Sequence, residues 1–169
     1  TSKQDAKNFV LNNIDTNIEK NNERFHEVNN MDFEDLKELT VNDHLIGSHT
    51  VNHKKLTEID NIDELNFEIV NSKQELENIL ECKINNFAWT YGDINSINKK
   101  IYNILKKHYN NIFSGIRGNN TSIGSGSIFF RDELSPFYTK ELVNAFLNGY
   151  SDFYYYKNRR QLLNLETYV

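Results

Sequence analysis

The stretch IGSHTVNHKKL, residues 46–56, joins the end of a short apolar run to two histidines spaced four residues apart. We predict a strand from His44 to Ser48, followed by a loop. If the chain turns helical after that strand, His49 and His53 face the same way. Neutral imidazoles are good ligands for zinc and related divalent ions, so a metal site is one interpretation. The alternative is a pair of exposed or hydrogen-bonded histidines at the start of a helix.

A second stretch, FAWTYGD at residues 87–93, also joins a short predicted strand to residues that could form part of a functional site. The predicted strand Asn86–Trp89 runs into aromatic residues and a Gly-Asp turn. Such a turn can form the wall of a sugar site, and a backbone N–H within it can stabilise an oxyanion. The alternative is the end of a strand whose aromatic side chains belong to the core.

Short apolar runs alternate with longer helical periodicities along the whole chain, which is typical of an α/β fold. The predicted strands are Asn8–Leu11, His44–Ser48, Asn86–Trp89, Ile112–Ile116 and Ser127–Phe130. The predicted helices are Asp32–Thr40 with Asp32 as N-cap, Ile62–Leu80, Ile97–Leu105 and Thr139–Leu147. Residues 117–127 are predicted to form a loop, and the pattern of residues 152–169 assigns no element. Without a repeat or linker, residues 1–169 are expected to form one domain.

Composition excludes several other classes of protein. A net charge of −5 over 169 residues argues against a nucleic-acid partner, because such binding needs clustered Lys and Arg. Cys82 is the only cysteine, which excludes an intrachain disulfide and a Cys-rich zinc site. No apolar run approaches a membrane span, and residues 1–5 lack a signal-peptide pattern. Cytoplasmic and cell-envelope locations both fit, and the sequence assigns no oligomeric state.

The two stretches and the helix between them together resemble the polysaccharide deacetylases, the NodB-homology group of carbohydrate esterase family four. Residues 46–56 are similar to that family's His-Ser/Thr-x-x-His motif, which follows an Ile-Gly-Ser strand. The helix then carries Glu68-Ile69 and Ser72-Lys73, as the family's helix does, and residues 87–92 are similar to its Phe-Ala-aromatic-x-Tyr-Gly turn. The resemblance implies a distorted (β/α) barrel.

The resemblance also implies roles for particular residues. His49 and His53 would bind one divalent metal ion, with zinc expected, and Thr50 would hydrogen-bond within the loop to hold them. Tyr91 would give its backbone N–H to the oxyanion. Trp89, Tyr91 and Gly92 would contact the carbohydrate substrate. The implied activity is hydrolysis of acetyl groups from N-acetylated sugars of a polysaccharide or cell-surface glycan, in which a metal-bound water attacks and an aspartate acts as base.

The sequence departs from the family pattern in several places. The family's Thr-Phe-Asp-Asp-Gly motif, which supplies the base and a third ligand, has no counterpart, since no Asp-Asp pair occurs in the chain. We therefore expect a fragment that begins downstream of that motif and a barrel that is incomplete at its N-terminus and only marginally stable. Ala88 and Thr90 stand where many members have Arg and Pro.

Two questions follow from these departures. Arg131, after the last predicted strand, either substitutes as a charged site residue or is a surface or structural arginine. The chain itself is either a sugar deacetylase domain or a catalytically inactive carbohydrate-binding relative that keeps the groove. A third possibility, an unrelated α/β domain with incidental histidines, does not explain why both motifs occur in the family's order.

Overall fold

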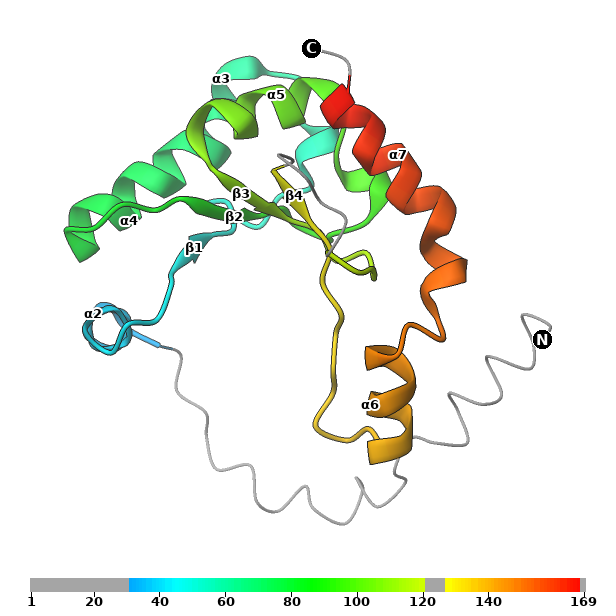
Figure 1. Cartoon of the computed structure of the whole chain (residues 1–169). Coiled ribbons are helices and arrows are strands. Elements are labelled where there is room, and N and C mark those ends of the chain that lie inside the picture. Colours follow the sequence, from blue (N-terminus) through cyan, green and yellow to red (C-terminus); the bar gives the residue numbers. More distant parts are fainter. Residues whose placement is uncertain (1–30, 121–126, 168–169) are drawn as a thin grey trace.

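A four-stranded parallel sheet forms the centre of the molecule, described here from a computed structural model over residues 31–120 and 127–167 (Figure 1). Its strands lie in the order β1-β2-β3-β4 and each pairs with the next in parallel. They are β1 (Gly47–Ser48), β2 (Asn86–Ala88), β3 (Asn111–Phe113) and β4 (Ile128–Phe129). The predicted α/β class is thus confirmed, while closure into a barrel stays a prediction. The predicted strand Asn8–Leu11 lies outside the described residues.

The helices begin where the sequence supplies caps. Asp32 caps α2 (Phe33–Val41) and forms a reciprocal capping box with Asp35, as expected of an acidic N-cap residue. Asn98 caps α5 (Lys99–His108) and Thr139 caps α6 (Lys140–Leu147), each by accepting a backbone N–H. The remaining helical elements are η3 (Leu56–Glu58), α3 (Ile62–Asn66), η4 (Phe67–Asn71), α4 (Ser72–Leu80), η5 (Ile94–Ser96), η6 (Asp152–Tyr155) and α7 (Tyr156–Thr167).

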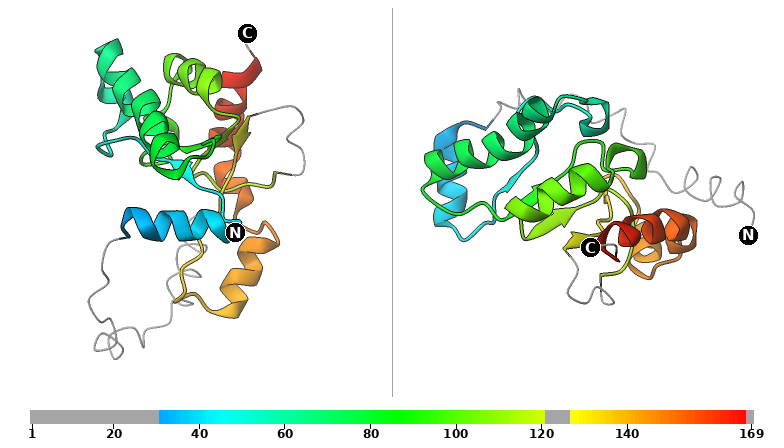
Figure 2. Two further views of the ribbon diagram at one scale, coloured as in Figure 1. Left: turned by 90° about the vertical axis from the view of Figure 1, so that its left-hand side faces the viewer. Right: turned by 90° about the horizontal axis from the view of Figure 1, so that it is seen from above.

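The long helix predicted over Ile62–Leu80 is present, but it contains a π-helical turn, η4, between α3 and α4. Together with α5 it covers one face of the sheet (Figure 2). Phe87, Ile112 and Ile128 are paired neighbours in the register of β2, β3 and β4. They form the apolar row of the sheet on which the helices pack. All three are fully buried, and so are the helix residues Leu65, Ile69, Ile101 and Leu105.

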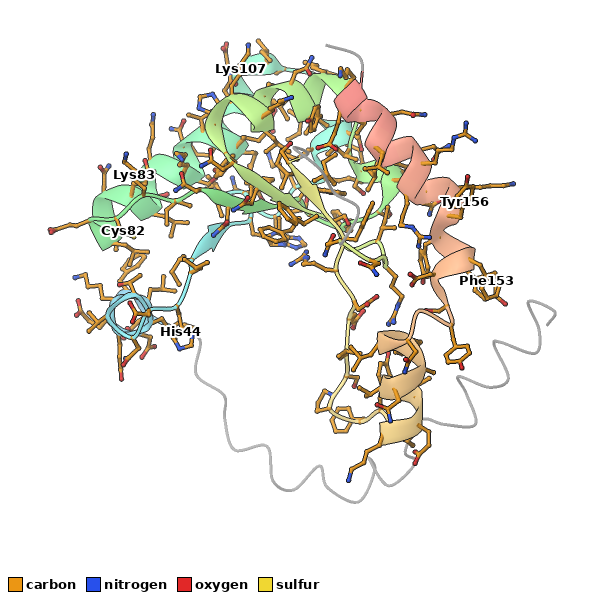
Figure 3. The ribbon with its side chains drawn as sticks, in the orientation of Figure 1. His44, Cys82, Lys83, Lys107, Phe153 and Tyr156 are labelled. Atoms are coloured by element: carbon orange, nitrogen blue, oxygen red, sulfur yellow. The ribbon has the colours of Figure 1, made fainter. Side chains whose placement is uncertain are left out.

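The C-terminal part of the chain forms an arm of two helices, which the sequence assigned only in part. Helix α6 lies away from the sheet, and α7 returns along its β4 side (Figure 1). The aromatic residues Phe153 and Tyr156 lie on the outer side of this arm (Figure 3), and both are more than half exposed. Within the described residues, no helix combines the length and the apolar character needed to cross a bilayer.

Candidate functional site

The loop after β1 brings the two motif histidines together without forming a helix. The ring centroids of His49 and His53 are 4.9 Å apart, with the planes inclined at 67°. Left-handed backbone conformations at Thr50 (φ 68°) and His53 (φ 56°) make the turns. The two rings thus lie side by side, although the chain does not turn helical between them. For residues with a Cβ, each left-handed conformation costs roughly 1–2 kcal/mol, so the loop needs support from its surroundings.

A hydrogen bond to the next strand fixes the orientation of the His49 ring. Its Nδ1 lies 2.7 Å from the carbonyl oxygen of Ala88, at the end of β2. A carbonyl oxygen can only accept, so Nδ1 carries the proton and donates it. In a neutral imidazole this leaves the Nε2 lone pair available, which is the arrangement that metal-binding histidines use.

The turn after β2 places Tyr91 beside His53. Their ring centroids are 5.5 Å apart, and the Tyr91 side chain is 62% exposed. Tyr91 and Gly92 both have positive φ, at 65° and 64°. Gly92 fits closely against Gly115, whose N–H donates to the Gly92 carbonyl oxygen over 2.9 Å, and a Cβ on Gly92 would lie 2.7 Å from the Gly115 nitrogen. The turn therefore presents the Tyr91 ring outward.

Two residues predicted to contact substrate are instead part of the protein interior. The Trp89 side chain is 1% exposed, and its Nε1–H donates to the carbonyl oxygen of Asp93. Gly92 is buried against Gly115. The prediction of direct substrate contacts by Trp89 and Gly92 is therefore wrong, because neither residue offers a surface. Tyr91 is the aromatic residue of this turn that faces outward.

Arg131 and His49 line the same hollow, of about 600 Å³, which runs along strands β1, β2 and β3. The Arg131 Nε–H donates to the carbonyl oxygen of Ser114 over 2.8 Å, and its guanidinium carbon lies 5.8 Å from the centre of the Phe113 ring. Burial lowers the pKa of this guanidinium from its ordinary value. The structure thus brings Arg131 to the hollow that His49 borders. The other lining residues are Leu45, Gly47, Ser48, Asn86, Phe87, Ala88, Asn111 and Phe113.

A buried carboxylate, Glu68 of η4, holds the histidine loop. It accepts hydrogen bonds from the backbone N–H groups of Val51 and Asn52 and from the Asn52 side chain. Thr50, expected to hold the loop, has a buried hydroxyl that finds no partner within residues 31–120 and 127–167, so that prediction is wrong. A signal for Glu68 was present in the sequence, because it shares a helical face with Leu65 and Ile69 and carries a charge there.

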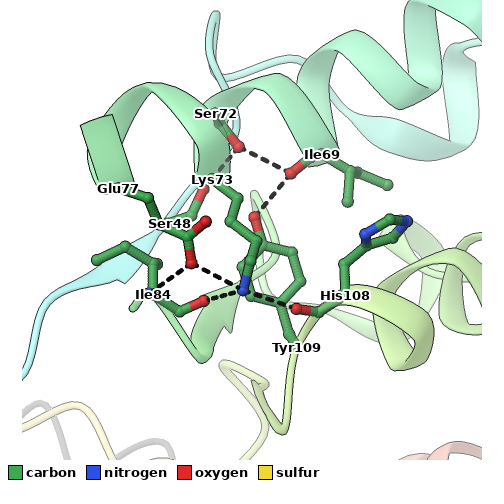
Figure 4. A network of polar contacts seen from close by, with 8 residues as sticks. All are labelled: Ser48, Ile69, Ser72, Lys73, Glu77, Ile84, His108 and Tyr109. Carbon is green, nitrogen blue, oxygen red and sulfur yellow. Dashed lines mark hydrogen bonds and ion pairs between the residues drawn. The ribbon is translucent and has the colours of Figure 1, made fainter. Parts of the chain in front are cut away.

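A second polar network supports the strand that leads into the loop (Figure 4). Ser48 shares a 2.7 Å hydrogen bond with Ser72, whose hydroxyl also donates to the Ile69 carbonyl oxygen. That oxygen accepts from the Tyr109 hydroxyl as well, and burial raises the pKa of Tyr109. Because Ser48 directly precedes His49, this network fixes the start of the loop against η4, α4 and the C-terminal end of α5.

No group of three or more His, Cys, Asp or Glu side chains suitable for a metal ion occurs in the described part of the chain. The described site therefore offers a pair of imidazoles, one with its lone pair oriented by Ala88, beside an exposed tyrosine. Two imidazoles can hold part of the coordination sphere of a divalent ion, which in hydrolytic sites includes a third protein ligand and water.

The fold is similar to solved structures of polysaccharide deacetylases. A polysaccharide deacetylase from Bacillus cereus matches at a TM-score of 0.57 and 21% identity, over 69% of this chain and 36% of that one. A Bacillus anthracis protein assigned to the same group matches at a TM-score of 0.57 and 21% identity, over 80% of this chain and 39% of that one. This chain thus spans under half the length of either protein, and at this identity the likeness shows the fold.

The family assignment comes from the sequence itself. No curated protein matches the chain. The polysaccharide deacetylase family model, however, matches residues 3–111, a span that includes both histidines, Glu68 and the turn at Tyr91. It covers more than half of the chain, and the parallel α/β fold agrees with it. The chain therefore belongs to the polysaccharide deacetylase family.

Proposed function

We propose that this chain carries part of the active site of a metal-dependent deacetylase, which removes acetyl groups from N-acetylated sugars of a polysaccharide or cell-surface glycan. The observation that supports this most directly is the histidine pair. His49 and His53 lie side by side, and the bond from His49 Nδ1 to the Ala88 carbonyl oxygen leaves its Nε2 free to bind a metal.

His49 and His53 are the residues that would hold the metal, and we propose zinc because two neutral imidazoles suit it. When bound, the metal would supply Lewis acidity and would activate water at neutral pH. The orientation of the His49 ring is already set by Ala88, so this residue needs no rearrangement to bind.

Tyr91 and Arg131 are the proposed substrate-facing residues. The exposed Tyr91 ring, next to His53, offers an aromatic face for a sugar ring, and its backbone N–H is the proposed donor to the oxyanion of the acetyl group. The Arg131 guanidinium borders the hollow shared with His49, where it can orient a polar substituent of the sugar. Its bond to the Ser114 carbonyl oxygen keeps it in place.

Zinc titration of the full chain, followed by calorimetry, tests the metal proposal. His49→Ala and His53→Ala should each abolish or strongly weaken zinc binding. His44→Ala is the matched control, because His44 is an exposed histidine just before β1 (Figure 3) and should leave the affinity unchanged. Zinc binding that is equal in all four proteins would contradict the proposal.

Acetate release from N-acetylated chito-oligosaccharides, measured with and without zinc, tests the reaction. Release that depends on both histidines supports a deacetylase. If the chain binds the oligosaccharide, detected by quenching or shifts at Tyr91, yet releases no acetate, the alternative of a catalytically inactive carbohydrate-binding relative is favoured. Tyr91→Ala should weaken oligosaccharide binding in either case, because it removes the exposed aromatic face.

A further inference from the structure

We propose that Glu68 is a positioning residue, which fixes the spacing of His49 and His53 by binding the backbone between them. This inference rests on the proposed function of the two histidines. It identifies the residue that holds them at the spacing needed to bind a metal. Glu68 lies in the π-helical turn η4 and is completely buried, so its carboxylate meets only protein atoms within the described structure.

The contacts of Glu68 converge on the middle of the loop. Its Oε2 accepts the backbone N–H groups of Val51 and Asn52, over 3.0 and 2.8 Å. Its Oε1 accepts the Nδ2–H of Asn52 over 2.7 Å. Both amides belong to residues that lie between His49 and His53. A buried carboxylate is costly unless donors satisfy it, and here three N–H groups do so.

The other contacts that hold the loop lie at its two ends. At one end, Ser48 bonds to Ser72 and His49 to the Ala88 carbonyl oxygen. At the other end, the Thr90 hydroxyl donates to the Lys54 carbonyl oxygen.

Thr50 and His53 both adopt left-handed backbone conformations, which residues with a Cβ rarely keep unless surrounding contacts enforce them. The side chains of Val51 and Asn52 are exposed, so they add little packing. Two backbone hydrogen bonds to one carboxylate oxygen therefore supply a large part of the constraint on the backbone that separates the two rings.

The helical segment that carries Glu68 is anchored in the core. Leu65 and Ile69, on either side of it, are fully buried in the core between the helical layer and the sheet. π-Helical turns inside helices occur often at functional sites, where they adjust which side chains face inward. Glu68 thus connects the loop to the packed core through its hydrogen bonds to the Val51 and Asn52 amides. It is not proposed as a metal ligand, because both of its oxygens are engaged by N–H donors.

A charged residue on the same helical segment provides a matched control. Glu64 of α3 lies four positions before Glu68, but its carboxylate is partly exposed and pairs with Lys54 over 2.6 Å. Removal of Glu64 changes the charge near the loop by the same amount without touching the Val51 and Asn52 amides. A difference between the two variants therefore reports the hydrogen bonds and not the net charge.

The test is zinc affinity of the folded full chain, measured by calorimetry for the wild type and for Glu68→Ala, Glu68→Gln, Asn52→Ala and Glu64→Ala. Glu68→Ala should weaken zinc binding by about 10–100-fold, the usual effect of losing a residue that orients ligands. Glu68→Gln should lose less, because one oxygen can still accept both backbone amides and Asn52 can turn its amide. Asn52→Ala should also lose less, and Glu64→Ala should match the wild type.

Circular dichroism and the thermal melt, recorded without metal, separate positioning from stability. If Glu68→Ala and Glu68→Gln are folded at the measuring temperature and bind zinc as tightly as the wild type, the proposal is overturned whatever their melting temperatures. If Glu68→Ala does not fold, the comparison of Glu68→Gln and Asn52→Ala with Glu64→Ala decides in the same way. A wild type without histidine-dependent zinc binding would instead overturn the proposed function itself.

Discussion

The site-bearing region, residues 47–116, and the C-terminal arm, residues 130–167, are held together by different forces. In the first, aligned strands and a helical layer enclose one apolar core, with Phe87, Ile112 and Leu105 completely buried. In the arm, Leu147, Tyr150 and other large apolar side chains remain more than half exposed. Buried apolar area therefore supports the site, whereas the arm buries little of its own.

The arm is attached through polar contacts at particular points and through Tyr155, Leu162 and Leu165, which pack against the core. Glu166 of α7 accepts the backbone N–H groups of Ser127 and Ile128, at the start of β4. Arg159 donates to the carbonyl oxygens of Arg117 and Asp152, and Leu162 is the fully buried apolar contact of α7. The family match ends at residue 111, close to the boundary between the two regions. The geometry of the candidate site is thus set mostly within the region that the family shares.

The largest expected difference between the regions comes from truncating one buried side chain in each. Ile112→Ala, in the central strand β3, should destabilise the protein by about 2–5 kcal/mol, because the sheet and helices cannot collapse into the cavity. Leu142→Ala in α6 removes an equally buried side chain from a cluster outside the main core. Urea unfolding with hydrogen exchange should show global loss for the first. For the second, exchange should rise in α6 while the amides of β2 and β3 stay protected.

Equal global destabilisation by both substitutions, with exchange rising throughout the sheet in Leu142→Ala, would remove the distinction between the regions.

A pair of glycines with positive φ sharpens the comparison. Gly149→Ala, in the arm, should cost roughly 1–2 kcal/mol, since the φ of 74° is strained but a Cβ meets only ordinary contacts with Asp152. Gly92→Ala adds a clash with the Gly115 nitrogen to the same kind of strain, so roughly 1–3 kcal/mol more is expected. Thermal melts give both values. If Gly92→Ala proves no worse than Gly149→Ala, the close approach at residue 115 has no importance for stability.

The smallest expected effect is a difference in pH dependence. The backbone N–H of Ile84, with help from Lys73, lowers the pKa of Glu77. Its contribution to folding is therefore present above the ordinary carboxyl pKa and is lost as the pH falls through the folded value. Burial raises the pKa of Asp132 against the opposing effect of Arg117, so its protonation favours the folded state as the pH falls.

Free energies of unfolding at pH 7, 5.5 and 4 should show these opposite signs. Glu77→Gln should lower stability at pH 7 and flatten its decline toward pH 4. Asp132→Asn should leave stability at pH 7 unchanged or slightly higher and make the decline steeper. Glu75→Gln, on the exposed side of α4, serves as the control and should follow the wild type. Identical slopes in all four proteins would show that neither carboxyl group is shifted in solution.

Local signals in the sequence predicted most of the helices. Asp32 was recognisable as an N-cap, and the apolar spacing from Leu65 to Leu80 predicted the long helix of the first region. Helix α7 gave no such signal, because among residues 156–166 only Leu162 is fully buried, Leu165 is partly buried against the core, and most of the other residues are exposed. Trp89 was misplaced for a related reason, since an aromatic residue at a strand end can face the core or the solvent with the same neighbours in sequence.

The sequence by itself determined the properties that depend on residues close together in the chain. These are the helix cap at Asp32, the helical and strand periods, and the histidine pair that follows a strand. Tertiary structure alone decided the left-handed turns at Thr50 and His53, the bond between His49 and Ala88, and the support of the loop by Glu68. The physical reason is distance along the chain. Glu68 meets Asn52 across 16 residues and His49 meets Ala88 across 39, and such contacts exist only once the helical layer has packed on the sheet.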